Sequence, residues 1–272
     1  MKTILVLTDY SDVSENAVHY AMKMAGYLKA KIIIMHVFHV PVPTSDMPIV
    51  ISYDELEKNS MKQLGDFYDR IKKEHSETVL TELITEGGFA TSEILSLLEK
   101  RKIDLAVMGV TGAGKSKSVL WGSTATSVMK KTKCPVLIVP KKMKFKKPSK
   151  IVLAYDFNAV IPKYVTHSIK WLVNVFKSEV FVFDMLLRDE RKYEKALAGV
   201  HVDDRFSETK HSMHFHEGEN VLAEINSFVD EKNADWLIMI PHKYNFWESL
   251  FHRSTTKQMA FQTKVPLLSV HD

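Results

Sequence analysis

A glycine-rich stretch in the first half of the chain is the part of the sequence best suited to bind an anionic ligand such as a phosphate group. Residues 109–116 read GVTGAGKS and match the phosphate-binding pattern G-x-x-x-x-G-K-[ST] at every position. Continued to Ser123, the stretch also fits the frame G-x-x-G-x9-G-S. Glycine lets backbone N–H groups approach an anion without a Cβ atom in the way. Both frames therefore predict phosphate binding, but they belong to different folds.

The context of this stretch favours the longer frame. A P-loop follows the first strand of its domain and needs a downstream strand that ends in aspartate, whereas this stretch follows the fourth predicted strand and the next one, PVLIVP, ends without an acid. Gly122 would also fall inside the helix that a P-loop requires, where glycine is costly. Ser123 and Thr124 instead precede a predicted helix, whose first backbone amides can bind an anion. Lys115 either reaches a terminal phosphate or belongs to a solvent-exposed loop.

The elements that would position these residues alternate between strand and helix. Short apolar runs separated by helical patterns are typical of a parallel sheet covered on both faces. The fold class is therefore α/β, with two tandem doubly wound Rossmann-like domains, each with a five-stranded parallel sheet. Strands are predicted near residues 3–8, 31–38, 80–86, 103–109 and 135–140 of the first half, and near 150–155, 179–186, 211–216, 235–240 and 265–270 of the second.

The two halves resemble each other in sequence. ITEGGFATSEILSLLEKRKIDLAVM at 84–108 corresponds to FHEGENVLAEINSFVDEKNADWLIM at 215–239, an offset of 131 residues. Between the halves, residues 141–150 contain six lysines and are interpreted as a solvated linker, with a basic patch for anionic partners as the alternative. These features predict one domain at 1–143 and a second at 144–272.

The second half departs from the glycine pattern. At the same offset the three glycines are replaced by larger residues and only a hydroxyl pair survives, so that the equivalent positions hold Ile240, Lys243, Arg253, Ser254 and Thr255. Such side chains would fill the volume of a ribose and its phosphates. A nucleotide site is therefore predicted in the N-terminal half only, although Asp156 remains and the two basic residues leave another anion as an alternative.

Several motifs of the first half together resemble the universal stress protein family. They are VLTDYS at the end of the first strand, His36-Val37 in the second, TEGG before the third helix, MGVTGAG…WGST, and CPVLIVP. The resemblance covers nearly the whole chain as a tandem of two domains, the first similar to the ATP-binding branch. It implies an adenine nucleotide alpha hydrolase-like fold with the nucleotide at the ends of the first and fourth strands.

The resemblance also implies a ligand and its contacts. The ligand would be ATP, AMP or a related adenine nucleotide, with Mg accompanying the phosphates. The implied contacts run from the base to the phosphates: Asp9 at the adenine or ribose, Val37 at the base, Met108 and Gly109 at the ribose, and Gly112, Gly122, Ser123 and Thr124 at the phosphates. Helix capping is the alternative role for Asp9, but Asp12 is the better cap candidate.

Composition and charge limit the partners. The hydrophobic and charged fractions, 45% and 26%, are those of an ordinary globular protein, and a net charge of +4 does not suggest nucleic acid. The apolar run at the N-terminus is too short for a signal peptide or a membrane span, so a cytoplasmic location without membrane contact is expected. The resemblance further implies an intramolecular pseudo-dimer that pairs the last strands of the two halves. Homodimerisation is an additional expectation.

Three functions remain open from the sequence. The leading hypothesis is a nucleotide-responsive stress or regulatory module, with no catalytic residue and slow ATP hydrolysis at most. The alternatives are a P-loop-like enzyme that hydrolyses ATP or transfers a phosphoryl group using Lys115 and Ser116, and a nucleotide-free structural scaffold. Three histidines of a predicted strand, expected on one face, are interpreted as surface residues rather than zinc ligands: His211, His214 and His216.

Overall fold

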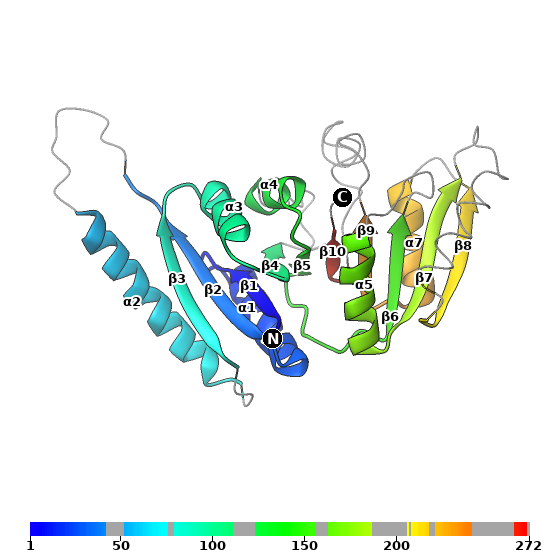
Figure 1. Cartoon of the computed structure of the whole chain (residues 1–272), viewed down its shortest axis with the longest axis horizontal. Coiled ribbons are helices and arrows are strands. Elements are labelled where there is room, and N and C mark those ends of the chain that lie inside the picture. The colour runs from blue at the N-terminus through cyan, green and yellow to red at the C-terminus, as the bar shows by residue number, and fades with distance from the viewer. Residues whose placement is uncertain are drawn as a thin grey trace. The chain divides into compact units, whose positions relative to one another are not determined.

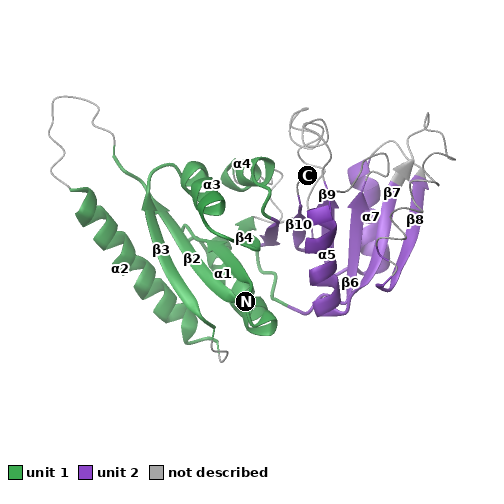
Figure 2. Ribbon diagram, in the orientation of Figure 1, with its two compact units in different colours: residues 1–110, 121–134, 141–145 green, residues 111–120, 135–140, 146–272 purple. Residues whose placement is uncertain are grey.

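A computed structural model of the chain describes residues 1–41, 52–75, 79–110, 123–155, 163–186, 206, 208–217, 221–240 and 264–270. The chain divides into two compact units, shown in different colours in Figure 2. Unit 1 comprises Met1–Val110, Trp121–Cys134 and Lys141–Phe145. The described residues of unit 2 fall within Pro135–Pro140 and Lys146–Asp272.

Unit 1 contains a parallel sheet in the order β3-β2-β1-β4. Its strands are β1 (Thr3–Leu7), β2 (Lys31–Phe38), β3 (Thr81–Gly87) and β4 (Leu105–Val110). The chain moves outward from β1 to β3 and then returns to add β4 on the other side of β1. Strand order therefore reverses between β1 and β4, and this reversal determines where a ligand crevice can form.

Four helices cover the sheet of unit 1 (Figure 1). They are α1 (Asp12–Leu28), α2 (Tyr53–Lys72), α3 (Ala90–Lys100) and α4 (Ser123–Lys131). Because parallel crossovers are right-handed, the outward connections place α1 and α2 on one face and the returning ones place α3 and α4 on the other. An ion pair between Arg70 and Glu15 joins α2 to α1, and α3 contacts α4.

The first turn of α1 is capped by Ser11, not by Asp12 as predicted. Ser11 has the extended backbone that a helix cap needs, with φ −69° and ψ 155°, and its Oγ accepts a hydrogen bond from the backbone N–H of Ser14 at 3.3 Å. Asp12 is already helical. Its side chain is 90% exposed and lies 3.5 Å from Lys141 Nζ.

Unit 2 contains a sheet in the order β8-β7-β6-β9-β10-β5. Its strands are β5 (Val136–Pro140), β6 (Lys150–Tyr155), β7 (Glu179–Leu186), β8 (His211–Glu217), β9 (Trp236–Ile240) and β10 (Leu267–Ser269). Helices α5 (Lys163–Phe176) and α7 (Val221–Lys232) pack in the same unit. Its largest buried side chain, Trp236, meets the ring of Phe176 edge-on at 5.5 Å. All ten predicted strands are thus present.

One pairing in unit 2 breaks the parallel pattern. β5 belongs to the first half of the sequence, yet it pairs antiparallel with β10, with Ile138 opposite Leu267. The other pairs of this unit for which a register is described are parallel. The expected pairing of the last strands is therefore observed, and it groups the fifth strand of the first half with unit 2.

An aspartate anchors the start of one strand in each unit. In unit 1, Asp104 Oδ2 accepts a hydrogen bond from the backbone N–H of Thr3 at 2.9 Å. In unit 2, Asp235 Oδ2 accepts from the backbone N–H groups of Ser149 and Lys150 at 2.7 and 3.0 Å. The two aspartates are separated by the same 131 residues as the sequence match. The local structure at the starts of β1 and β6 is thus equivalent.

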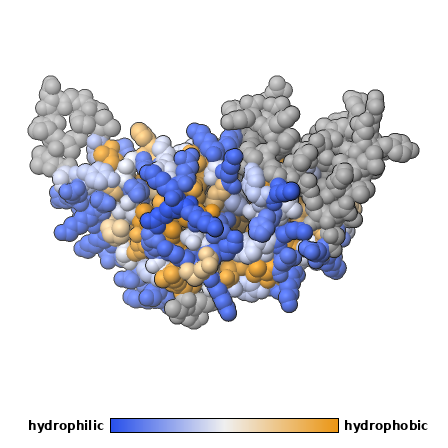
Figure 3. Space-filling view, in the orientation of Figure 1, coloured by the Kyte–Doolittle hydropathy of each residue, from blue (hydrophilic) through white to orange (hydrophobic). Residues whose placement is uncertain are grey.

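The described surface mixes hydrophilic and hydrophobic side chains. Figure 3 shows hydrophilic residues, in blue, interspersed with hydrophobic ones on the face in view. None of the helices in the described ranges combines the length and the apolar character needed to cross a membrane.

Candidate functional site

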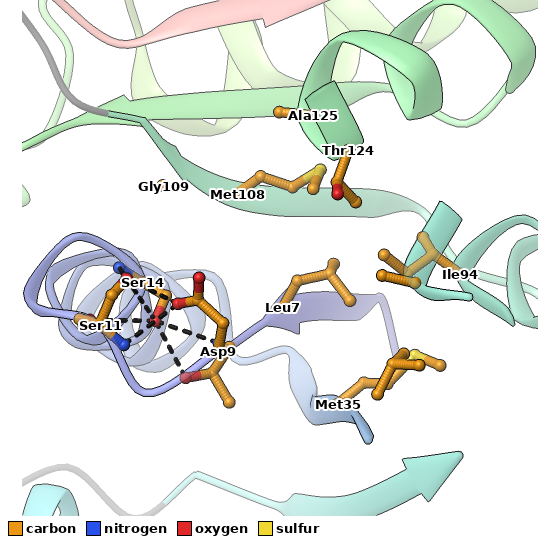
Figure 4. A pocket seen from close by; sticks show the side chains of 13 residues that line it. Leu7, Asp9, Ser11, Ser14, Met35, Ile94, Met108, Gly109, Thr124 and Ala125 are labelled. Atoms are coloured by element: carbon orange, nitrogen blue, oxygen red, sulfur yellow. Dashed lines mark hydrogen bonds between the residues drawn. The ribbon is translucent and has the colours of Figure 1, made fainter. Parts of the chain in front are cut away.

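A pocket opens in unit 1 at the carboxyl ends of β1 and β4, where strand order reverses (Figure 4). It encloses about 200 Å³. Ligands of open α/β sheets bind in crevices at this point of the topology. Five residues predicted from the sequence line the pocket: Asp9, Val37, Met108, Gly109 and Thr124.

The floor of the pocket is apolar and comes from four different elements. Leu7 of β1, Met35 of β2, Ile94 of α3 and Met108 of β4 all line it, and each is at most 8% exposed. Figure 4 shows Leu7, Met35 and Ile94 gathered at one end of the pocket. Buried thioether and aliphatic groups of this kind suit a flat apolar ligand group, because methionine adapts to the shape of its neighbour.

The other wall is polar and consists of the turn between β1 and α1. Asp9 Oδ1 accepts hydrogen bonds from the backbone N–H and the hydroxyl of Ser11, at 3.1 and 2.6 Å. The backbone N–H of Asp9 donates to Ser14 Oγ at 3.2 Å, and the buried Thr8 Oγ1 lies 3.1 Å from the same oxygen. Both hydrogen bonds from Ser11 go to Oδ1 of the Asp9 carboxylate. Oδ2 has further capacity to accept a hydrogen bond from a ligand.

The environment of Asp9 keeps its carboxyl group ionised. Partial burial raises the pKa of Asp9, but hydrogen bonds from the Ser11 and Ser14 side chains and from backbone N–H groups lower it further, so the pKa lies below its ordinary value. At neutral pH this side chain is an acceptor only. It is suited to bind hydroxyl or amino groups rather than phosphates.

Gly109 is required by packing as well as by the pocket. A Cβ atom at this position would collide with the backbone carbonyl group of Val13, whose carbon would be 2.8 Å away. The missing side chain lets the first turn of α1 lie directly over the end of β4. This close approach places Ser11 and Ser14 at the pocket, a role that the motif alone did not predict.

Tyr10 adopts a strained conformation beside Asp9. Its φ of 64° lies in the left-handed region, which is uncommon for a residue with a side chain. Its ring packs against His36 at 4.4 Å and against Phe67 of α2 at 5.3 Å, while His36 Nδ1 donates to the carbonyl oxygen of Thr8 at 2.9 Å. These contacts fix the turn that carries Asp9.

Replacing Tyr10 by phenylalanine is expected to stabilise the protein. The Tyr10 hydroxyl is buried without a hydrogen-bond partner in the described structure, and burial raises its pKa to about 12. Removing an unpaired buried hydroxyl should raise the free energy of unfolding by about 1 kcal/mol. Urea unfolding would measure this, with Tyr53→Phe as the control because Tyr53 is 46% exposed. A loss of stability would show that the hydroxyl has a partner.

The remaining predicted contacts have different outcomes. Ser123 is the first residue of α4 and is exposed, and it does not line the pocket, whereas Thr124 and Ala125 do. Gly112, Lys115 and Gly122 lie outside the described residues, as do Ser116 and the second-half positions 156, 243 and 253–255. Five lining residues lie outside the sequence motifs, one in β2 and the others in helices: Ser14, Met35, Ala90, Ile94 and Ala125.

The histidines of β8 do not share one face. The rings of His214 and His216 pack against Phe228 of α7, at 4.9 and 5.0 Å. His211 is an odd number of residues away, so it faces the other side, where its Nδ1 donates to the Thr209 carbonyl oxygen at 2.9 Å. No group of three or more potential metal ligands was found among the described His, Cys, Asp and Glu residues.

Comparison with known proteins identifies the family. The model of the universal stress protein family matches residues 1–140, more than half of the chain. The chain belongs to the universal stress protein family. As expected for this family, the sheet is Rossmann-like and mostly parallel, and the matched region contains the elements that build the pocket.

Relatives of this universal stress protein include both one-domain and full-length matches. Universal stress protein MJ0531 of Methanocaldococcus jannaschii is 33% identical over 146 residues, which cover 53% of this chain and 84% of the relative. Universal stress protein YxiE of Bacillus subtilis is 30% identical over 143 residues, which cover 50% of this chain and 97% of the relative. The crystal structure of a universal stress protein from Archaeoglobus fulgidus superposes with a TM-score of 0.78 at 18% identity, covering 99% of this chain and 98% of that one. The last match shows a common fold along the whole chain.

Proposed function

We propose that this universal stress protein binds an adenine nucleotide, ATP or AMP, in the pocket of unit 1 and acts as a nucleotide-responsive module. The observation that carries the proposal is the placement of an ionised carboxylate opposite a buried apolar floor at the strand-order reversal. A nucleoside needs both surfaces, one for the flat base and one for the ribose hydroxyls. The resemblance of the first-half motifs to the ATP-binding branch of the family implies the same ligand class.

The proposed pose follows the chemistry of the walls. The base lies on the Met35 and Ile94 end of the floor, bordered by Val37, and the ribose hydroxyls donate to Asp9 Oδ2. The described pocket of about 200 Å³ is smaller than typical ligand pockets of roughly 300–1,000 Å³, so it accommodates the nucleoside end. The phosphates, with Mg, are assigned to the glycine frame, which ends at Gly122 and Ser123.

The C-terminal half is proposed to lack this site. Continuing the β1–β4 register by two residues places Thr8 opposite Gly109, two small residues at the mouth of the pocket. In unit 2 the register places Tyr155 opposite Ile240, and both are 5% exposed. The large side chains of Tyr155 and Ile240 thus occupy the positions that Thr8 and Gly109 occupy in unit 1. This difference supports a nucleotide site in the first half only.

We also propose that residues 1–143 and 144–272 are tandem universal stress protein domains that form an intramolecular pseudo-dimer. The equivalent Asp104 and Asp235 anchors and the β5–β10 pairing support the tandem arrangement. Homodimerisation and a cytoplasmic location stay predictions. We assign no catalytic residue, so any ATP hydrolysis is expected to be slow.

Measuring the nucleotide content of the purified full-length chain tests the proposal. Acid extraction followed by mass spectrometry, together with calorimetric titration with ATP, AMP and cAMP, should give about one adenine nucleotide per chain. Two per chain would contradict the restriction to the first half. No bound nucleotide and no titration heat would favour the scaffold. Rapid turnover that is lost in Lys115→Ala would favour the enzyme, whereas the proposal expects a mild effect of this substitution.

A further inference from the structure

Two histidines join α1 to the turn that ends α2. Nδ1 of His19, in α1, lies 2.9 Å from Nε2 of His75, and the two ring planes are inclined by 27° with their centroids 5.2 Å apart. Each imidazole nitrogen can donate or accept, depending on its protonation. A hydrogen bond between two imidazoles needs one nitrogen that carries a proton and one that does not.

Among the described residues, two carboxylates lie within ion-pair distance of His19. Glu15 Oε1 and Glu74 Oε2 each lie 3.9 Å from His19 Nε2. Arg70 holds Glu15 through two hydrogen bonds of 2.6 and 2.8 Å. These hydrogen bonds lower the pKa of Glu15, so its carboxylate stays negative in the pH range in which histidines titrate.

We propose that His19 and His75 form a proton-sensitive clasp that holds α2 against α1 while at most one of the two rings is protonated. When both rings carry a proton, all four nitrogens are donors and the hydrogen bond has no acceptor. Two positive charges then face each other at hydrogen-bond distance. The clasp therefore opens when the second proton binds, and the carboxylates partly offset the repulsion without restoring the bond.

The helix that the clasp holds also contacts the turn at the pocket. Phe67 of the same helix packs on Tyr10, whose left-handed backbone carries the turn between Asp9 and Ser11. Loosening α2 would remove this support from the polar wall. We therefore expect acidification to weaken ligand binding as well, and this second effect rests on the proposed function.

The sign and size of the effect follow from proton linkage. At a pH well above about 6.5, neither state holds an added proton on the rings. As the pH falls, the open state gains a proton on each ring, whereas the closed state gains at most one, so the open state is increasingly favoured. Free imidazole side chains gain their proton near pH 6.5. The ratio of closed to open molecules should therefore fall about tenfold between pH 7.5 and pH 5.5.

Hydrogen exchange of the full-length chain tests the clasp without a ligand. Protection factors of the amides in Tyr53–Lys72, corrected for the intrinsic exchange rate at each pH, should fall about tenfold from pH 7.5 to 5.5 in the wild type. In the double variant His19→Asn, His75→Gln they should change less than about twofold, because the amides can pair and do not titrate. An unchanged wild type, or an equal fall in the double variant, would overturn the proposal.

Two further variants keep the test decisive if the double variant folds poorly. His75→Gln alone leaves an amide oxygen that accepts from a protonated His19, so it too should abolish the pH dependence. His39→Asn, a substitution at an exposed histidine of the same unit, should keep the wild-type dependence. ATP titrations at both pH values test the coupling. If ATP bound at neither pH, the proposed function would be contradicted, but the hydrogen-exchange result would still test the clasp.

Discussion

Gly109→Ala is expected to destabilise the protein by about 3 kcal/mol and to abolish nucleotide binding, because the added methyl group has no space. Its carbon would overlap the Val13 carbonyl group, which is backbone and cannot rotate away as a side chain can. The first turn of α1 would have to lift from the end of β4. Ser11 and Ser14 would then leave the pocket wall, so stability and binding should be lost together.

A second glycine of unit 1 provides the matched control for this experiment. Gly65 lies within α2, and a Cβ atom there would meet nothing within 4 Å. Gly65→Ala should therefore stabilise the protein by about 0.5–1 kcal/mol through the better helix propensity of alanine. Urea unfolding and calorimetric titration of both variants measure the two effects. Similar stabilities for the two variants would refute the packing role of Gly109.

Asp9→Asn is expected to weaken nucleotide binding about thirty-fold while leaving the fold intact, since a hydrogen bond to a charged group contributes about 2 kcal/mol. The asparagine oxygen can still accept the two hydrogen bonds from Ser11 that shape the turn. The other carboxylate oxygen, however, is replaced by an amino group that cannot accept from the ribose. The loss should therefore be seen in the dissociation constant and not in the unfolding transition.

The control for this substitution lies on the same turn of the chain. Asp12→Asn also removes one negative charge, but Asp12 is exposed and does not line the pocket. Its binding constant should stay within about twofold of the wild type, because exposed charges are strongly screened. Equal losses in Asp9→Asn and Asp12→Asn would reduce the role of Asp9 to a general charge effect. Unchanged binding in both would make Asp9 a turn residue only.

The sequence was sufficient to predict the strands because burial on both faces gives each strand a nearly continuous apolar run. β1 and β9 are entirely or almost entirely buried, and both were placed to within two residues. The cap of α1 was wrong by one residue because serine and aspartate are equally good caps. Only the backbone conformation of Ser11 distinguishes them.

The candidate site was predictable only where a motif marked it. Asp9 and Gly109 follow strands directly, and their types suggest a ligand. Ser14 and Ile94 line the same pocket through helix packing, which a local pattern does not reveal. Tyr10 is harder still, because its left-handed backbone depends on ring contacts with residues of β2 and α2 that are distant in the sequence.

The antiparallel pairing of β5 with β10 has a consequence for how the chain can be divided. The lysine-rich segment that follows β5 is the natural place for a protease to cut, but a cut there leaves β5 paired with the last strand of the C-terminal fragment. The two fragments of a nicked chain would stay joined through backbone hydrogen bonds. A separately produced N-terminal fragment would instead expose that strand edge, which invites association with another copy. The linker between the two halves of the sequence therefore does not coincide with the boundary between the parts that are held together by strand pairing.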